Sequence, residues 1–161
     1  MAGKLIALLA VIVSGCVPVI GMVYIPMNAA DAVAINYGGC TLPSASFKRK
    51  IGDGVTLIVS ITESDYKTPQ LLIEGWVEVG KSARFLDSGV KVSSASSISY
   101  FKLLSSGLLD RPERFFLPGI TGRTESIVVS LPPVMVNGTF VEIEPITFKP
   151  QQILGTRWIC A

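Results

Sequence analysis

The residue types that enzymes commonly use for catalysis are sparse in this chain of 161 residues. It contains no histidine, which excludes serine–histidine and cysteine–histidine nucleophilic sites and removes the commonest zinc ligand. The remaining option is a carboxylate pair, Glu142 and Glu144. On a strand these two side chains share a face about 7 Å apart, whereas the acid and base of a glycosidase flank the bond from opposite sides. We therefore predict that the protein is not an enzyme and uses neither a metal nor another cofactor.

An aromatic residue between two carboxylates is the first candidate for a binding site. The segment 71–79, LLIEGWVEV, alternates so that its aliphatic residues fall on one face of a strand and Glu74, Trp76 and Glu78 on the other. If the aliphatic face is the core, Trp76 points outward, and large exposed aromatic residues are enriched in partner and ligand sites. The alternative is that a loop or the N-terminal segment covers Trp76.

The longest irregular stretch, 105–124, is the second candidate. It is rich in glycine and proline and shows no clear period. Loops of this length are often functional, and arginine with phenylalanine suits a protein interface. The candidate contact residues are Arg111, Arg114, Phe115, Phe116 and Arg123. In the alternative interpretation, the phenylalanines pack into the edge of the domain and the arginines are only solvated.

The first sixteen residues carry an export signal. One positive charge, Lys4, precedes an apolar run over 5–13, which has the length of the hydrophobic region of a signal peptide. The sequence VSGC at 13–16 resembles the lipobox of bacterial lipoproteins, which consists of an aliphatic residue, two small residues and a cysteine. The resemblance implies that residues 1–15 are removed and that Cys16 becomes the N-terminus with a diacylglycerol on its sulfur.

This resemblance implies an export and anchoring class, not a domain family. Val17 stands where an aspartate would be an inner-membrane retention signal, so the implied location is the outer membrane, facing the periplasm or the cell surface. Two alternatives stay open. The apolar residues continue far enough for 5–25 to span a membrane, or an ordinary secretory signal ends near Gly15. The apolar segment 17–27 also predicts a strand that packs against the domain, not a long flexible tether.

The cysteine content fits an exported protein. If Cys16 carries the lipid, Cys40 and Cys160 remain as an even pair. In an oxidising periplasm they would join the first segment of the domain to its last strand. The chain-entropy treatment gives such a disulfide about 4–5 kcal/mol of stabilisation. The alternative is a pair of unrelated buried thiols.

The charge distribution excludes one class of partner. The formal net charge is +2, and no basic stripe interleaved with aromatic residues occurs, so there is no electrostatic case for nucleic acid. A basic run, KRK at 48–50, either contacts anionic lipid headgroups near the anchor or serves solubility. The predicted partners are the membrane, through the lipid, and another protein of the envelope.

Short β-strands are the elements that would position these residues. Segments 54–62 and 71–79 alternate with period two. Segment 90–104 predicts two strands around a serine-rich turn, or one long bent strand. Segments 125–136 and 139–148 predict a hairpin joined by Asn137-Gly138, a dipeptide that favours the type I′ turn.

The number of short strands and turns indicates the fold class. After residue 27 no sustained helical period occurs. We expect a single antiparallel β-sandwich, immunoglobulin-like or related, over 40–161, with a small β-barrel as the second architecture. Residues 16–39 would form a segment close to the anchor.

Together these features predict a membrane-anchored envelope lipoprotein that acts as a non-enzymatic interaction or structural module. The alternative function is that of a domain that binds a glycan or small ligand. The sugar would stack on Trp76, and Glu74 or Glu78 would accept hydrogen bonds from its hydroxyl groups. A third alternative is an inhibitor of a cell-wall-degrading enzyme.

The mass of the protein purified from membranes tests the lipobox. We expect the wild type to lack residues 1–15 and to carry acyl mass that a Cys16→Ala variant does not carry. A full-length chain without acyl mass would contradict the lipobox and favour a membrane span over 5–25.

Overall fold

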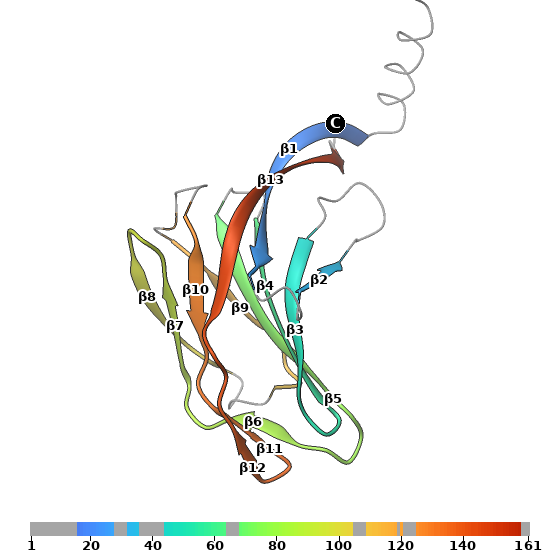
Figure 1. The fold of residues 1–161 in the computed structure, drawn as a ribbon, viewed down its shortest axis with the longest axis vertical. Helices are drawn as coiled ribbons and strands as arrows, with labels where there is room; N and C mark the ends of the chain where they lie inside the picture. The colour runs from blue at the N-terminus through green and yellow to red at the C-terminus, as the bar shows by residue number, and fades with distance from the viewer. Residues whose placement is uncertain are drawn as a thin grey trace, which may run out of the picture.

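The fold is a β-sandwich with a small additional sheet. The computed structural model describes residues 16–27, 32–35, 44–63, 68–104, 109–118, 120 and 125–158. Within these ranges the regular elements are strands, and all of their pairings are antiparallel. Two five-stranded sheets pack against each other, and a three-stranded sheet lies at one end (Figure 1). The expected fold class is therefore confirmed.

The sheets combine strands that are far apart in the sequence. In spatial order, sheet 1 contains β1 (Cys16–Pro26), β13 (Ile146–Trp158), β10 (Ile127–Ser130), β7 (Gly89–Ser93) and β8 (Ile98–Lys102). Sheet 2 contains β2 (Ala32–Ile35), β3 (Ser44–Gly52), β4 (Val55–Glu63), β5 (Pro69–Val77) and β9 (Glu113–Phe116). The end sheet contains β12 (Thr139–Val141), β11 (Val134–Val136) and β6 (Ala83–Phe85).

The core is built by side chains that alternate along each strand. On β4 the four aliphatic residues predicted for one face are each at most 1% exposed: Val55, Leu57, Val59 and Ile61. Sheet 1 supplies the opposing layer, whose most deeply buried members are Val90, Val92, Ile127, Val129, Ile146 and Phe148. Because the side-chain period of a strand is two, burying one set of residues exposes the intervening set.

The predicted hairpin turn is present. Asn137 and Gly138 join β11 to β12 with positive φ angles of 49° and 83°, as the turn requires. The Asn137 side chain also connects this turn to two others. Its Oδ1 accepts a hydrogen bond from the Ser82 N–H at 2.9 Å, and its Nδ2 donates to the Asp53 carbonyl at 3.0 Å.

Pro132 and Pro133 divide the segment 125–136 into β10 and β11, and neither strand is at the edge of its sheet. β10 lies between β13 and β7, and β11 lies between β12 and β6, so both neighbouring strands are interior. The prolines instead occupy the connection in which the chain leaves sheet 1 for the end sheet. A connection does not require the ladder hydrogen bond that proline cannot donate.

Two strands were not predicted in full from the periodicity of the sequence. β9 lies inside the stretch 105–124 that showed no period, because four residues are too few for a period to be recognised. The second is the 13-residue β13, which begins within the predicted hairpin arm 139–148 and continues to Trp158. β13 is this long because β1 pairs with its whole second part.

The segment after Cys16 is a strand, as the apolar run predicted. β1 pairs with β13 in a continuous antiparallel register that runs from Cys16–Trp158 to Pro26–Phe148. In the part of the chain that the structure describes, no helix is long and apolar enough to cross a membrane. Cys40 and Cys160 lie outside the described residues, so their disulfide stays a prediction.

A substitution at Gly75 tests the packing on the inward side of sheet 2. A Cβ at this position would lie 2.3 Å from Leu109 Cδ2 and 2.8 Å from the Leu109 carbonyl oxygen. Because backbone cannot move aside easily, we expect Gly75→Ala to lower the free energy of unfolding by about 1–3 kcal/mol in denaturant titrations. Gly89→Ala is the matched control, since the nearest atom to its Cβ is 4.0 Å away. Equal effects of the two variants would contradict the described packing.

Candidate interaction face

Four of the predicted contact residues lie on the outward side of sheet 2. Glu74 and Trp76 lie on β5, and Arg114 and Phe116 lie on the neighbouring strand β9. The register pairs Leu72 with Arg114 and Gln70 with Phe116, so all four residues belong to the same alternating set. Trp76 is 66% exposed and Phe116 is 58% exposed.

The inward set explains why these residues face outward. Ile73 on β5 and Phe115 on β9 are buried in the core. Gly75 is also inward, where Leu109 packs on it. The residues between them on both strands must therefore project to the opposite face.

β3 adds basic residues to this face. The register aligns Lys48 with Ile58 and then with Glu74, and it aligns Lys50 with Thr56 and then with Trp76. Both lysines are exposed. Neighbouring strands are about 4.8 Å apart, so each lysine backbone is two strand spacings from its partner on β5. We call this surface the Trp76 face, with the members Lys48, Lys50, Glu74, Trp76, Arg114 and Phe116.

The Trp76 face has a defined limit. Ser46 and Ser60 pair with each other on β3 and β4 in the outward set, yet they are only 1% and 6% exposed. The same row continues through Leu72 to the exposed Arg114. It is therefore covered at β3 and β4 and open at β9, and Phe116 lies one row beyond it, on the side away from Trp76. Within the described residues, the Ser46 hydroxyl has no hydrogen-bond partner.

From the sequence, Lys48 and Lys50 are predicted only as parts of the basic run KRK, for lipid headgroups or solubility, and not together with Trp76, because β3 is not predicted as a strand. Phe47 and Ile51 are buried, which would fit period two, but Arg49 interrupts the apolar set between them. Arg49 pairs with the inward residue Leu57, and its guanidinium carbon lies 5.2 Å from the centre of the Phe47 ring. A cation–π contact of this kind lets a charged residue occupy an inward position.

Other predicted contact residues lie elsewhere. Phe115 is only 8% exposed and packs against Phe101 with ring centres 5.2 Å apart, so it belongs to the core, as the alternative interpretation held. Arg111 and Glu78 are exposed in the connections before β9 and after β5. Arg123 lies outside the described residues.

The prediction that Glu142 and Glu144 lie on a strand is wrong. Glu142 and Glu144 are both exposed, in the connection between β12 and β13. The residue between them, Ile143, is buried. Among the residues that the structure describes, no group of three or more carboxylate or cysteine side chains is placed to hold a metal ion.

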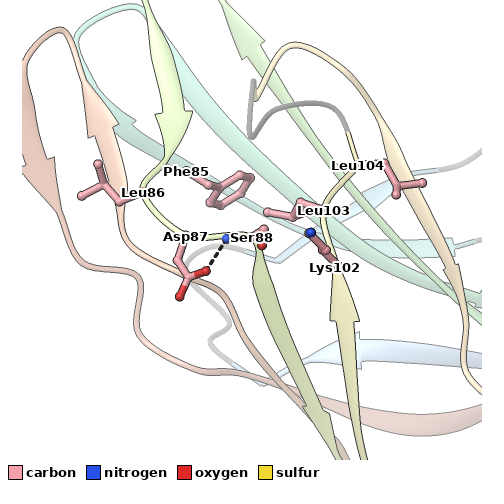
Figure 2. Close-up of a pocket in the computed structure, with 7 residues that line it drawn as sticks. All are labelled: Phe85, Leu86, Asp87, Ser88, Lys102, Leu103 and Leu104. Carbon is pink, nitrogen blue, oxygen red and sulfur yellow. Dashed lines mark hydrogen bonds between the residues drawn. The ribbon is translucent and has the colours of Figure 1, made fainter.

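One pocket lies beside the connection from β6 to β7 (Figure 2). Its volume is about 490 Å³, and it is lined by Phe85, Leu86, Asp87, Ser88, Lys102, Leu103 and Leu104. Asp87 Oδ1 accepts hydrogen bonds from the N–H groups of Ser88 at 2.5 Å and Gly89 at 3.3 Å. The Leu103 N–H donates to the Ser88 carbonyl at 2.8 Å. These contacts hold the connection to the end of β8, so the polar groups have a structural role.

A second pocket, of about 380 Å³, lies at the end sheet beside Asn137. Lys81 forms an ion pair with Asp53 at its rim. The hydrogen bond from Lys81 lowers the pKa of Asp53, and the same contact raises the pKa of Lys81. Both groups are in water, so the pair adds little stability. Trp76 lines neither of these two pockets.

Hydrogen bonds favour the charged form of Glu125, which lies just before β10. Glu125 Oε2 accepts hydrogen bonds from the Ser96 hydroxyl at 2.8 Å and the Ser96 N–H at 3.3 Å. These bonds and one from Ser94 lower the pKa of Glu125. The contact ties the serine-rich turn between β7 and β8 to the residues just before β10.

The chain matches no known family, no curated protein and no solved structure.

Fluorescence of Trp76 tests whether the face is open. In a Trp158→Phe variant, Trp76 is the remaining tryptophan. Because its side chain is mostly exposed, we expect emission near that of tryptophan in water and strong quenching by acrylamide. The same variant unfolded in denaturant gives the upper limit of quenching. A blue-shifted emission that resists acrylamide would mean that another segment covers the face.

Proposed function

We propose that this protein is a lipid-anchored module of the bacterial envelope that binds another envelope protein on the Trp76 face and catalyses no reaction. The observation that carries the proposal is the exposure of Trp76 and Phe116 on one side of a five-stranded sheet, together with Arg114. Tryptophan and arginine are among the residues that most often dominate binding energy in protein interfaces.

The rigidity of the face supports this function. Trp76 and Phe116 lie on paired strands whose inward-facing residues are buried. The backbone therefore loses little further conformational entropy when a partner binds. Each aromatic ring has two side-chain torsions to fix. Covering the rings removes apolar surface from water at about 25 cal/mol per Å².

The charges of the face indicate the chemistry of the partner. The face contains three cations, Lys48, Lys50 and Arg114, and one carboxylate, Glu74. The cations are in excess, so a complementary surface would present apolar side chains with carboxylates around them. Acidic groups on the partner would speed association, and salt would weaken this electrostatic effect. The aromatic contacts would set the lifetime of the complex.

A protein partner fits this face better than a glycan. Small-ligand sites are concave, whereas Trp76 projects from a sheet face and lines neither described pocket. Glu74, which would accept hydroxyl hydrogen bonds from a sugar, shares its row with Lys48, and Arg114 is in the neighbouring row. The lipobox resemblance of Cys16 supports the envelope as the compartment in which the partner is found.

Site-specific photo-crosslinking in cells tests the proposal. A photoreactive phenylalanine analogue at position 76 is expected to form an adduct with one envelope protein. Tyr100 is the matched control, because it is 74% exposed on β8 of sheet 1. With the identified partner purified, Trp76→Ala is expected to weaken binding by about 30-fold or more, the effect of a hot-spot residue. Tyr100→Ala is expected to leave binding unchanged.

Two outcomes would overturn the protein-binding function. Absence of any adduct at position 76 would contradict the proposal that the Trp76 face is an interface. Equal adducts at positions 76 and 100 would show unspecific proximity in the envelope, not a docking face.

A further inference from the structure

The ladder between β1 and β13 leaves no tether between the lipid and the fold. The lipobox places the diacylglycerol on Cys16, and Cys16 is also the first residue of β1, opposed to Trp158. Opposed residues of an antiparallel pair have Cα atoms about 4.5–5.5 Å apart. The anchor, when present, is therefore attached within one strand spacing of position 158.

The outer part of this ladder stands apart from the sandwich. β10 pairs with β13 only over Ile146–Phe148, so in the described residues Lys149 to Trp158 pair with β1 alone. The inner half of β1 packs on the core, with Met22, Val23 and Tyr24 buried. The outer half extends beyond the other strands as a two-stranded ribbon (Figure 1). We call residues 16–21 and 153–158 the anchor ribbon.

The composition of the anchor ribbon suits the surface of a lipid bilayer. Its strands read CVPVIG and ILGTRW, which contain one charged residue, Arg157, and no acidic residue. Tryptophan is enriched where a membrane meets water, and a basic residue is attracted to anionic headgroups. A two-stranded ribbon also has unpaired backbone groups along both edges, which cannot be placed in the hydrocarbon core without cost.

We infer that the anchor ribbon lies in the headgroup region of the membrane and holds the sandwich in a fixed orientation. This inference rests on the proposed lipid anchor but not on the proposed protein partner. The end sheet lies at the opposite end of the molecule from the ribbon (Figure 1). β5 ends at Val77, one residue after Trp76, and the chain then enters β6 of the end sheet. The orientation therefore keeps Trp76 away from the bilayer, where a partner can reach it.

The two tryptophans of the chain allow a direct test. In the lipidated full chain, Trp76→Phe leaves Trp158 as the reporter, and Trp158→Phe leaves Trp76. Each protein is reconstituted into phosphatidylcholine vesicles with phosphatidylglycerol, in which the acyl chains carry bromine either near the headgroup or near the chain end. Substituting Trp76 removes an exposed side chain, so the reporter protein is expected to fold.

The inference predicts a depth-dependent result. Trp158 is expected to lose about half or more of its emission to bromine near the headgroup and less to bromine near the chain end, as an interfacial residue would. Trp76 is expected to keep its emission with both lipids. Replacing phosphatidylglycerol by phosphatidylcholine, or Arg157 by glutamate, is expected to weaken the quenching of Trp158.

Three results would overturn the inference. Unquenched Trp158 in protein with confirmed acyl mass would show a domain that does not lie on its membrane, and it would leave the protein-binding function intact. Stronger quenching of Trp158 by the deep bromine would place the ribbon in the hydrocarbon. Absence of acyl mass would remove the anchor itself, whatever the crosslinking at position 76 shows.

Discussion

Burial of every second side chain between two sheets is the constraint on which this structure depends. β4 at the centre of sheet 2 shows it most simply, since Val55, Leu57, Val59 and Ile61 are excluded from water. Its neighbours β3 and β5 must keep the same register to bury Phe47 and Ile73. A slip of one residue on β5 would bury Trp76 and expose Ile73. The exposure of Trp76 is thus a consequence of the core.

The same constraint turns single residues into a surface. No two of Lys48, Trp76 and Arg114 are close in the sequence, and they share one face because four adjacent strands, β3, β4, β5 and β9, fix the rows across the sheet. The inward residues of β9 hold this arrangement from below. Glu113 is buried and accepts a hydrogen bond from the Leu104 N–H at 3.0 Å, and Phe115 packs on Phe101. The backbone of β9 in this face is therefore held by contacts on its inward side.

The first strand links the fold to its proposed anchor. Because β1 pairs with the last strand along its full length, the N-terminal segment is a component of sheet 1 and not a flexible leader to it. Lipoproteins of the class that the lipobox resembles often begin with a polar tether, and here the corresponding residues are apolar and extended. A lipid at Cys16 would then constrain orientation as well as distance from the membrane.

The sequence by itself determined the features that depend on neighbours along the chain. The alternation of 54–62 and 71–79 predicted two central strands and the outward direction of Trp76, and Asn137-Gly138 predicted the hairpin turn. Only the tertiary structure placed β9 beside β5, which put Arg114 and Phe116 on the same side of sheet 2 as Trp76 and turned Phe115 inward. Only it paired β1 with β13. These contacts join residues about forty to more than a hundred positions apart, and pairing at that distance is decided by the fit of whole sheets, which local periodicity does not encode.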